Sequence, residues 1–278
     1  METLKTHRMF GGEVRYLRHD SEACSVPMEL TVFLPREALA GEKLPVLYFL
    51  SGLTCTAENF TVKAAAQRYA AEQKLIIVAP DTSPRGNDVA DDDRYFVGKG
   101  ASFYVNATEA PYAAHYQMFD YVTEELPALI ESSFPVKPGA RGVTGHSMGG
   151  HGALIAALKK PGFYRSASAF SPIASASRCP WGEAALPLYL GEDKGAWEEY
   201  DASLLLAKTK ARLPIRIDQG LADNFYEEQL RTELLVEAAE AAGVPLEVHL
   251  HEGYDHSYFF VQSFIEEHIL HHARALHA

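Results

Sequence analysis

The sequence predicts an α/β protein built on a mostly parallel central sheet, with antiparallel strands where the chain enters the sheet and helices on both faces. Short apolar or β-branched runs recur along the chain, and from Pro45 onward they alternate with helical patterns. Such alternation builds a parallel sheet covered on both sides. No helical pattern separates the first two runs, so those strands are expected to be antiparallel. With 278 residues and no internal repeat or clear linker, the chain is expected to form one domain over residues 1–278.

Eight runs are expected to form strands. The stretch VLYFLSG at 46–52 is nearly all apolar, as a central parallel strand buried on both faces should be. The expected strands span residues 13–18, 28–34, 45–50, 75–79, 142–144, 166–170, 214–218 and 246–250.

Helical patterns occupy five segments, at residues 58–73, 112–132, 150–160, 227–242 and 258–275. Pro127 is expected to kink or end the second of these helices. The segments 81–110 and 171–200 are too long for plain connections, so we expect them to help form a functional site.

Composition excludes some classes of function. A net charge of −12 argues against nucleic-acid binding, which draws on basic patches. Cys24, Cys55 and Cys179 are few and far apart, which is typical of a reducing compartment. No apolar run approaches the roughly 20 residues of a membrane span, and the first 20 residues lack a signal-peptide pattern. We therefore expect a cytoplasmic protein that does not bind membranes.

One serine stands where the chain is expected to turn sharply. The sequence GHSMG at 145–149 has the pattern G-x-S-x-G, with a predicted strand before it and a predicted helix after it. This context is typical of a nucleophile elbow, in which glycines allow a turn too tight for Cβ atoms and the serine hydroxyl projects from the turn. Ser147 is therefore the candidate nucleophile.

A serine hydroxyl needs a base, and the base needs an orienting carboxylate. In this architecture the chain order is serine, acid, histidine. Asp223 lies in the loop after the strand at 214–218, and His256 lies in the turn after the last strand. We expect both to complete a triad with Ser147, with Asp255 and Asp218 as alternatives for the acid.

Acyl transfer also needs donors for the oxyanion that forms. The amide of Met148, directly after the nucleophile, is one candidate, and the amide of Leu53, after the strand at 45–50, is the other. No cofactor is expected, because no phosphate-binding loop or G-x-G-x-x-G after a strand is present. His268, His271 and His272 have helical spacing, but no carboxylate or cysteine completes a metal site, so a solvated helix face is expected.

Seven segments in order resemble the S-formylglutathione hydrolases of the esterase D family, which have the α/β-hydrolase fold. They are SGLTCTAENF, APDTSPRG, GHSMGGHGALI, CPWG, YLG, IDQGLADNF and EGYDHSYFF. The resemblance covers Ser51 to the C-terminus and reaches weakly into the first strands. It implies a cytosolic enzyme, often a homodimer, that cleaves S-formylglutathione to glutathione and formate. Ser102 and Asn106 depart from the family's pattern, which leaves details of the substrate groove open.

The family's triad falls on Ser147, Asp223 and His256, and its oxyanion donors fall on Leu53 and Met148. Trp181 is implied as a wall of the acyl pocket, although a plain core tryptophan is an equal interpretation. Cys55 is a candidate contact of the substrate, with a buried inert thiol as the alternative. The alternative function is that of a general short-chain carboxylesterase.

Leaving-group chemistry is compatible with the thioester substrate that the resemblance implies. A thiolate leaves with less help from a general acid than an alkoxide does. A narrow pocket would select a formyl group by excluding larger acyl chains. Arg85 and Lys99 are candidate contacts for the carboxylates of glutathione, but surface residues without a binding role are the more ordinary interpretation.

Overall fold

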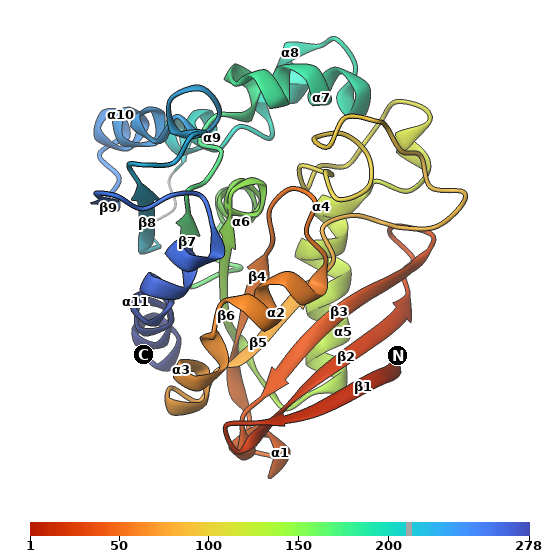
Figure 1. Ribbon diagram of the computed structural model, residues 1–278, viewed down its shortest axis with the longest axis vertical. Helices are drawn as coiled ribbons and strands as arrows, with labels where there is room; N and C mark the ends of the chain where they lie inside the picture. The colour runs from red at the N-terminus through yellow and green to blue at the C-terminus, as the bar shows by residue number, and fades with distance from the viewer. Residues whose placement is uncertain (210–212) are drawn as a thin grey trace.

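The computed structural model describes residues 1–209 and 213–278, and within them nine strands form one sheet in the order β1-β2-β3-β5-β4-β6-β7-β8-β9 (Figure 1). The first four strands in this order pair in antiparallel fashion, and all later neighbours are parallel. The expected fold class is therefore confirmed. The strands are β1 Glu2–Met9, β2 Gly12–Asp20, β3 Pro27–Leu34, β4 Leu44–Leu50, β5 Ile76–Pro80, β6 Val136–His146, β7 Ser166–Phe170, β8 Ile215–Gly220 and β9 Glu247–His251.

Strand β1 has no counterpart among the eight expected strands. Its sequence ETLKTHRM lacks the alternation of a half-buried strand, and all its residues except the last are exposed. It pairs with β2 and forms one edge of the sheet. The pairing is made by the backbone, which the side-chain pattern does not reveal.

The helices are α1 Arg36–Leu39, α2 Ala57–Lys63, α3 Ala66–Glu72, α4 Met118–Asp120, α5 Leu126–Ser133, α6 Met148–Lys159, α7 Pro180–Leu190, α8 Lys194–Glu198, α9 Ala202–Lys208, α10 Thr232–Ala242 and α11 Tyr258–His277. Short π-helical turns occupy Tyr121–Glu125 and Tyr226–Leu230. The segment expected to help form the site at 171–200 holds α7 and α8. Across the two described ranges, no helix is both long and apolar enough to cross a membrane.

Two expected helices have different boundaries. The pattern at 58–73 is broken into α2 and α3 because Ala65 has a left-handed backbone, with φ of 54°. The helical run does not end at Pro127, which lies in the first turn of α5, directly after the π-helical turn Tyr121–Glu125. A proline lacks the amide that would donate to the carbonyl four residues earlier, and a π-helical turn is a local irregularity at which a helix accommodates such a loss.

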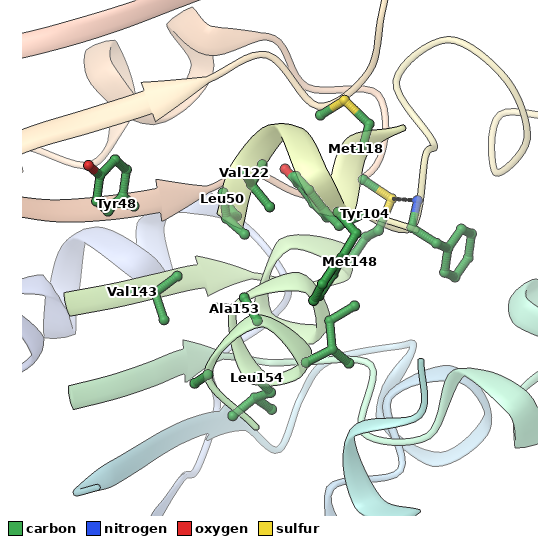
Figure 2. Close-up of a cluster of buried hydrophobic side chains, with 14 of the residues drawn as sticks. Tyr48, Leu50, Tyr104, Met118, Val122, Val143, Met148, Ala153 and Leu154 are labelled. Carbon is green, nitrogen blue, oxygen red and sulfur yellow. Dashed lines mark hydrogen bonds between the residues drawn. The ribbon is translucent and has the colours of Figure 1, made fainter. Parts of the chain in front are cut away.

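Each face of the sheet has its own core. Along β4, Val46, Tyr48 and Leu50 pack with α5 and α6, whereas Leu47 and Phe49 pack with α2, α3 and α11. This alternation follows from the two-residue period of a strand. Figure 2 shows the first of these cores, where side chains of β4 and β6 meet those of α6.

Three histidines of α11 contradict the expectation of a solvated helix face. His268 and His272 are fully buried, and His271 is 8% exposed. They face β7 and β8, where the small residues Ser166 and Ser168 leave room for imidazole rings. Helical spacing alone does not reveal on which side of the helix the sheet lies.

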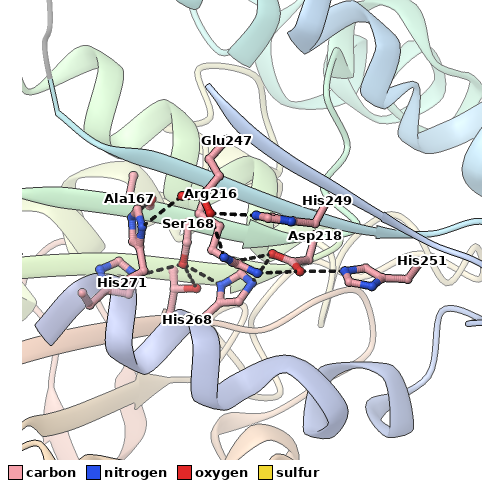
Figure 3. A network of polar contacts seen from close by, with 11 residues as sticks. Ala167, Ser168, Arg216, Asp218, Glu247, His249, His251, His268 and His271 are labelled. Atoms are coloured by element: carbon pink, nitrogen blue, oxygen red, sulfur yellow. Dashed lines mark hydrogen bonds and ion pairs between the residues drawn. The ribbon is translucent and has the colours of Figure 1, made fainter. Parts of the chain in front are cut away.

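The buried rings form a chain of hydrogen bonds that ends on Asp218 (Figure 3). Ser166 Oγ lies 2.7 Å from His272 Nδ1, and His272 Nε2 lies 2.8 Å from Ser168 Oγ. Ser168 Oγ lies 2.8 Å from His268 Nδ1, and His268 Nε2 lies 2.9 Å from Asp218 Oδ2. Ser168 Oγ also donates to Thr144 Oγ1 at 2.8 Å. Each ring nitrogen of His268 and His272 thus has a polar partner.

Asp218 joins three elements. Besides His268 of α11, its carboxylate accepts from the Nε of Arg216 at 2.7 Å and contacts Nε2 of His251, on β9, at 2.7 Å. Burial disfavours the charged carboxylate, but the bonds from His268 and Arg216 outweigh burial and hold the pKa of Asp218 below its usual range. A paired buried charge therefore connects β8, β9 and α11.

Lowering the pH from 7 to 5 is expected to lower the free energy of unfolding. Burial lowers the pKa of His268 to about 4 and that of His272 well below the usual range, whereas both lie near 6.5 in an unfolded chain. Below about pH 6.5 the unfolded chain binds protons that the native interior does not. Each such histidine then lowers the free energy of unfolding by about 1.4 kcal/mol for each pH unit of acidification. Urea unfolding at a series of pH values measures this loss.

His272→Asn is expected to be less stable than the wild type at pH 7 but to lose less stability on acidification. His277→Gln, at the exposed end of α11, is the matched control and should keep the wild-type slope. A wild-type stability that stays flat between pH 7 and 5 would show that these rings are charged in the native state.

Candidate active site

The turn that carries Ser147 connects the end of β6 to the start of α6. Ser147 has φ of 59° and ψ of −122°, a conformation that non-glycine residues seldom adopt. A Cβ on Gly145 would lie 2.1 Å from the Gly149 carbonyl oxygen, and one on Gly149 would lie 1.9 Å from that of Leu50. Only glycine fits at both positions, so the motif allows the turn to pack against the end of β4.

Hydrogen bonds hold the backbone of Ser147 on both sides. Its amide donates to the Phe170 carbonyl at 2.9 Å, and its carbonyl accepts from the amides of His151 at 3.0 Å and Ile173 at 3.3 Å. The strained conformation is therefore fixed by β7, by α6 and by the segment after β7.

Ser147 lines a cavity of about 810 Å³. One side of the cavity is formed by α2 and the start of α11, and an aromatic side is formed by Tyr95, Trp181 and Phe225. His256 also lines this cavity, so the structure brings the candidate nucleophile and base to one opening.

Asp223 contacts His256 directly. Its Oδ2 lies 2.5 Å from Nδ1 of His256, and its Oδ1 accepts the amide of Phe225 at 2.9 Å. The Asp223 side chain has no exposed surface, whereas the imidazole is 19% exposed toward the cavity. A carboxylate on Nδ1 leaves Nε2 free to exchange a proton.

The alternative acids lie elsewhere. Asp218, within β8, accepts from Arg216 and His268, and Asp255 accepts from the amide and hydroxyl of Ser257. Neither carboxylate has a hydrogen bond to His256 in the described residues. Of the three candidate acids, Asp223 is thus the one that contacts His256.

The loops after β8 and β9 are held together by their backbones. The Ala222 amide donates to the Tyr254 carbonyl at 2.9 Å, and the Leu221 amide donates to the His251 carbonyl at 2.9 Å. A Cβ on Gly220 would lie 2.4 Å from the Tyr254 oxygen. This close approach brings Asp223 and His256 side by side although they are far apart in the chain.

The expected oxyanion donors lie beside the nucleophile. Met148 is the first residue of α6, so its amide has no carbonyl one turn earlier in the helix. The amide of Thr54 donates to Gly100 and that of Cys55 to Gly52, whereas within the described chain the amide of Leu53 donates to no protein group. Both unused amides are able to receive a developing negative charge.

Trp181 and Cys55 both line the cavity. Trp181 is only 6% exposed and packs on Phe225 with ring centroids 4.8 Å apart, so it belongs to the core and to the cavity wall at once. Burial raises the pKa of the Cys55 thiol, which reduces its thiolate fraction and hence its reactivity. Cys55 as a substrate contact stays a prediction.

Arg85 and Lys99 do not line the cavity. Arg85 pairs with Asp81 at 2.8 Å, and Lys99 lies 3.7 Å from Asp91. Among the described residues, the lysine or arginine that does line the cavity is Lys63 of α2, which the sequence pattern did not distinguish from other surface lysines.

His146, inside the motif, is a second residue that sequence reasoning missed. The centroid of its ring lies 4.5 Å from that of the His256 ring, and its Nε2 is buried without a hydrogen-bond partner in the described structure. Burial, with the nearby charge of a protonated His256, lowers the pKa of His146 well below its usual range. A neutral ring therefore packs against the candidate base.

This fold, with a serine on a strained turn and an aspartate–histidine pair in the same cavity, defines a serine hydrolase of the α/β-hydrolase class. The family model described as "Putative esterase" matches residues 21–271. A solved S-formylglutathione hydrolase from Agrobacterium tumefaciens is 46% identical, with 99% of this chain and 100% of that chain covered and a TM-score of 0.97. The chain therefore belongs to this esterase family and, within it, to the S-formylglutathione hydrolases.

More distant structures share the fold. A fluorophosphonate-binding serine hydrolase of Staphylococcus aureus is 22% identical, with 94% of this chain and 98% of that chain covered and a TM-score of 0.76. An S-formylglutathione hydrolase of the same organism is 21% identical, with 94% of this chain and 99% of that chain covered and a TM-score of 0.72.

Gly52→Ala is expected to lower kcat about 10- to 100-fold, because small displacements of a nucleophile are costly. The new Cβ would lie 3.0 Å from the Cβ of Ser147 and 3.1 Å from the His146 carbonyl oxygen. Steady-state kinetics with a 4-nitrophenyl ester measure the loss. Gly195→Ala on α8 makes the same change away from the cavity and should keep full activity. Wild-type kcat in Gly52→Ala would contradict the assigned geometry.

Proposed function

We propose that this chain hydrolyses S-formylglutathione to glutathione and formate through an acyl-enzyme on Ser147. The observation that carries the proposal is the 2.5 Å contact between His256 and Asp223 at the cavity that Ser147 also lines. Family membership and the relative with 46% identity support the choice of substrate.

In the first stage, Ser147 Oγ attacks the thioester carbonyl while Nε2 of His256 accepts the hydroxyl proton. Asp223 holds the ring through Nδ1 and stabilises the imidazolium that forms. The amides of Leu53 and Met148 donate to the oxyanion, and each such donor lowers the barrier by about 3 kcal/mol. The carbon–sulfur bond then breaks, and His256 returns the proton to the departing thiolate.

In the second stage, His256 takes a proton from water, which attacks the formyl ester. Ser147 recovers its proton as formate leaves. A thiolate is a good leaving group, so thioesters and activated esters are cleaved far faster than amides.

The deciding experiment compares kcat/KM for S-formylglutathione, S-acetylglutathione and a 4-nitrophenyl ester. We expect the formyl thioester to be preferred. A preference for the oxygen ester would instead establish a general short-chain carboxylesterase.

We also propose a homodimer in the cytoplasm, as the family resemblance implies. The three described cysteines are free, as in a protein kept in a reducing compartment. Light scattering coupled to size-exclusion chromatography tests the dimer, and fractionation of cells tests the location.

Ser147→Ala is expected to abolish turnover and to change the melting temperature little. Alanine has the same backbone cost at positive φ as serine, so the fold of the turn is retained. The formate-release assay and a thermal melt, run on the same sample, separate the two effects. Residual turnover above about one-thousandth of the wild-type rate would reject the role of the serine.

Trp181→Ala is expected to raise the ratio of acetyl to formyl kcat/KM about tenfold, because removing the indole widens the acyl pocket by more than a methyl group. Trp181→Phe keeps an aromatic ring against Phe225 and should stay near the wild-type ratio. An unchanged ratio in both variants would move the acyl pocket away from Trp181.

A further inference from the structure

The charge of the cavity differs from that of the protein. The chain carries a net charge of −12, yet none of the described residues that line the cavity is Asp or Glu. Lys63 is the one lysine or arginine among those lining residues. An anion that enters therefore meets a local positive charge on a protein that repels anions elsewhere.

Lys63 has no ion pair in the described part of the chain. It ends α2, its side chain is exposed, and its Nζ lies over the ring of Tyr258. By contrast, Arg85 and Lys99 are held by aspartates. The Lys63 charge already acts inside the site, since it opposes the rise in the pKa of the Cys55 thiol that burial causes.

Two amide side chains line the same cavity as this ammonium group. Asn59 lies one turn earlier on α2, and its Oδ1 accepts from the amide and the hydroxyl of Thr56, which leaves its NH2 group as a donor. Gln262 lies on α11 and lines the same cavity. One ammonium and two amide donors are a suitable set for a carboxylate.

Lys63 lines the same cavity as the nucleophile. Its Nζ lies 5.7 Å from the centre of the Tyr258 ring, and the centre of that ring lies 5.6 Å from the centre of the His146 ring. Ser147, Tyr258 and Lys63 all line the cavity, so the thiol part of a thioester bound at Ser147 extends into a space that Lys63 also lines.

We propose that Lys63, with the side-chain amides of Asn59 and Gln262, binds a carboxylate of the thiol portion of the substrate and so selects thioesters of acidic peptides. The inference rests on the proposed function. It names the part of the substrate, distant from the scissile bond, that the enzyme recognises.

The test compares Lys63→Gln and Lys63→Glu with the wild type on two substrates. For S-formylglutathione we expect kcat/KM to fall about tenfold in Lys63→Gln and further in Lys63→Glu, mainly through KM, because uniform binding is lost. For neutral 4-nitrophenyl acetate we expect changes within about twofold. Lys137→Glu, at the opposite end of β6 from Ser147, makes the same change in net charge and should affect neither substrate.

A binding measurement separates this inference from the proposed function. Calorimetry with S-methylglutathione, which lacks the scissile bond, should show weaker binding to Lys63→Gln and, with the carboxylates esterified, little difference between the two proteins. If the wild type hydrolyses S-formylglutathione and neither measurement responds to Lys63, the carboxylate site is wrong. If the wild type neither hydrolyses the thioester nor binds the thioether, both proposals fall.

Discussion

The close packing of one turn against the end of β4 is the constraint on which the site depends. Gly149 lies against the Leu50 carbonyl, and Gly145 lies against Gly149, so there is no room for side chains in the turn. Ser147 is forced to positive φ, and bonds to Phe170 and Ile173 prevent the backbone from relaxing. Strain of this kind persists only where the surroundings over-determine it. Here three neighbouring parallel strands, β4, β6 and β7, supply those surroundings.

A second constraint on the site is the contact between Asp218 of β8 and His251 of β9. Asp218 and His251 bond to each other, and each stands five residues before a member of the aspartate–histidine pair. The loops that follow β8 and β9 are short and joined by backbone hydrogen bonds. The positions of Asp223 and His256 are therefore set by these two strands. The cost of burying a carboxylate is offset by several charge-assisted bonds. The structural pair thus lies on β8 and β9, and the candidate catalytic pair lies in the loops that follow these strands.

Sequence reasoning reached the fold and the candidate triad because their signals are local. A strand, a glycine-bounded serine and a helix occur consecutively, and Asp223 could be preferred to Asp218 because a loop follows the strand. Burial of His268 could not be inferred, because its spacing is equally compatible with either side of a helix, and the serines that receive it lie a hundred residues away. Lys63 was missed because an exposed lysine on a helix has no local signal, and its place at the cavity depends on α2 and the start of α11 lining one space.

The exposed first strand has a consequence for encounters between molecules. In the described part of the chain, one side of strand β1 pairs with no other strand, and such an open edge is where the sheets of separate molecules join and fibrils grow. Glu2, Lys5 and Arg8 place solvated charges along that border. A foreign strand aligned there would have to strip water from these charges without gaining apolar contact. The polar composition that kept β1 from being predicted therefore disfavours edge-to-edge association with other molecules.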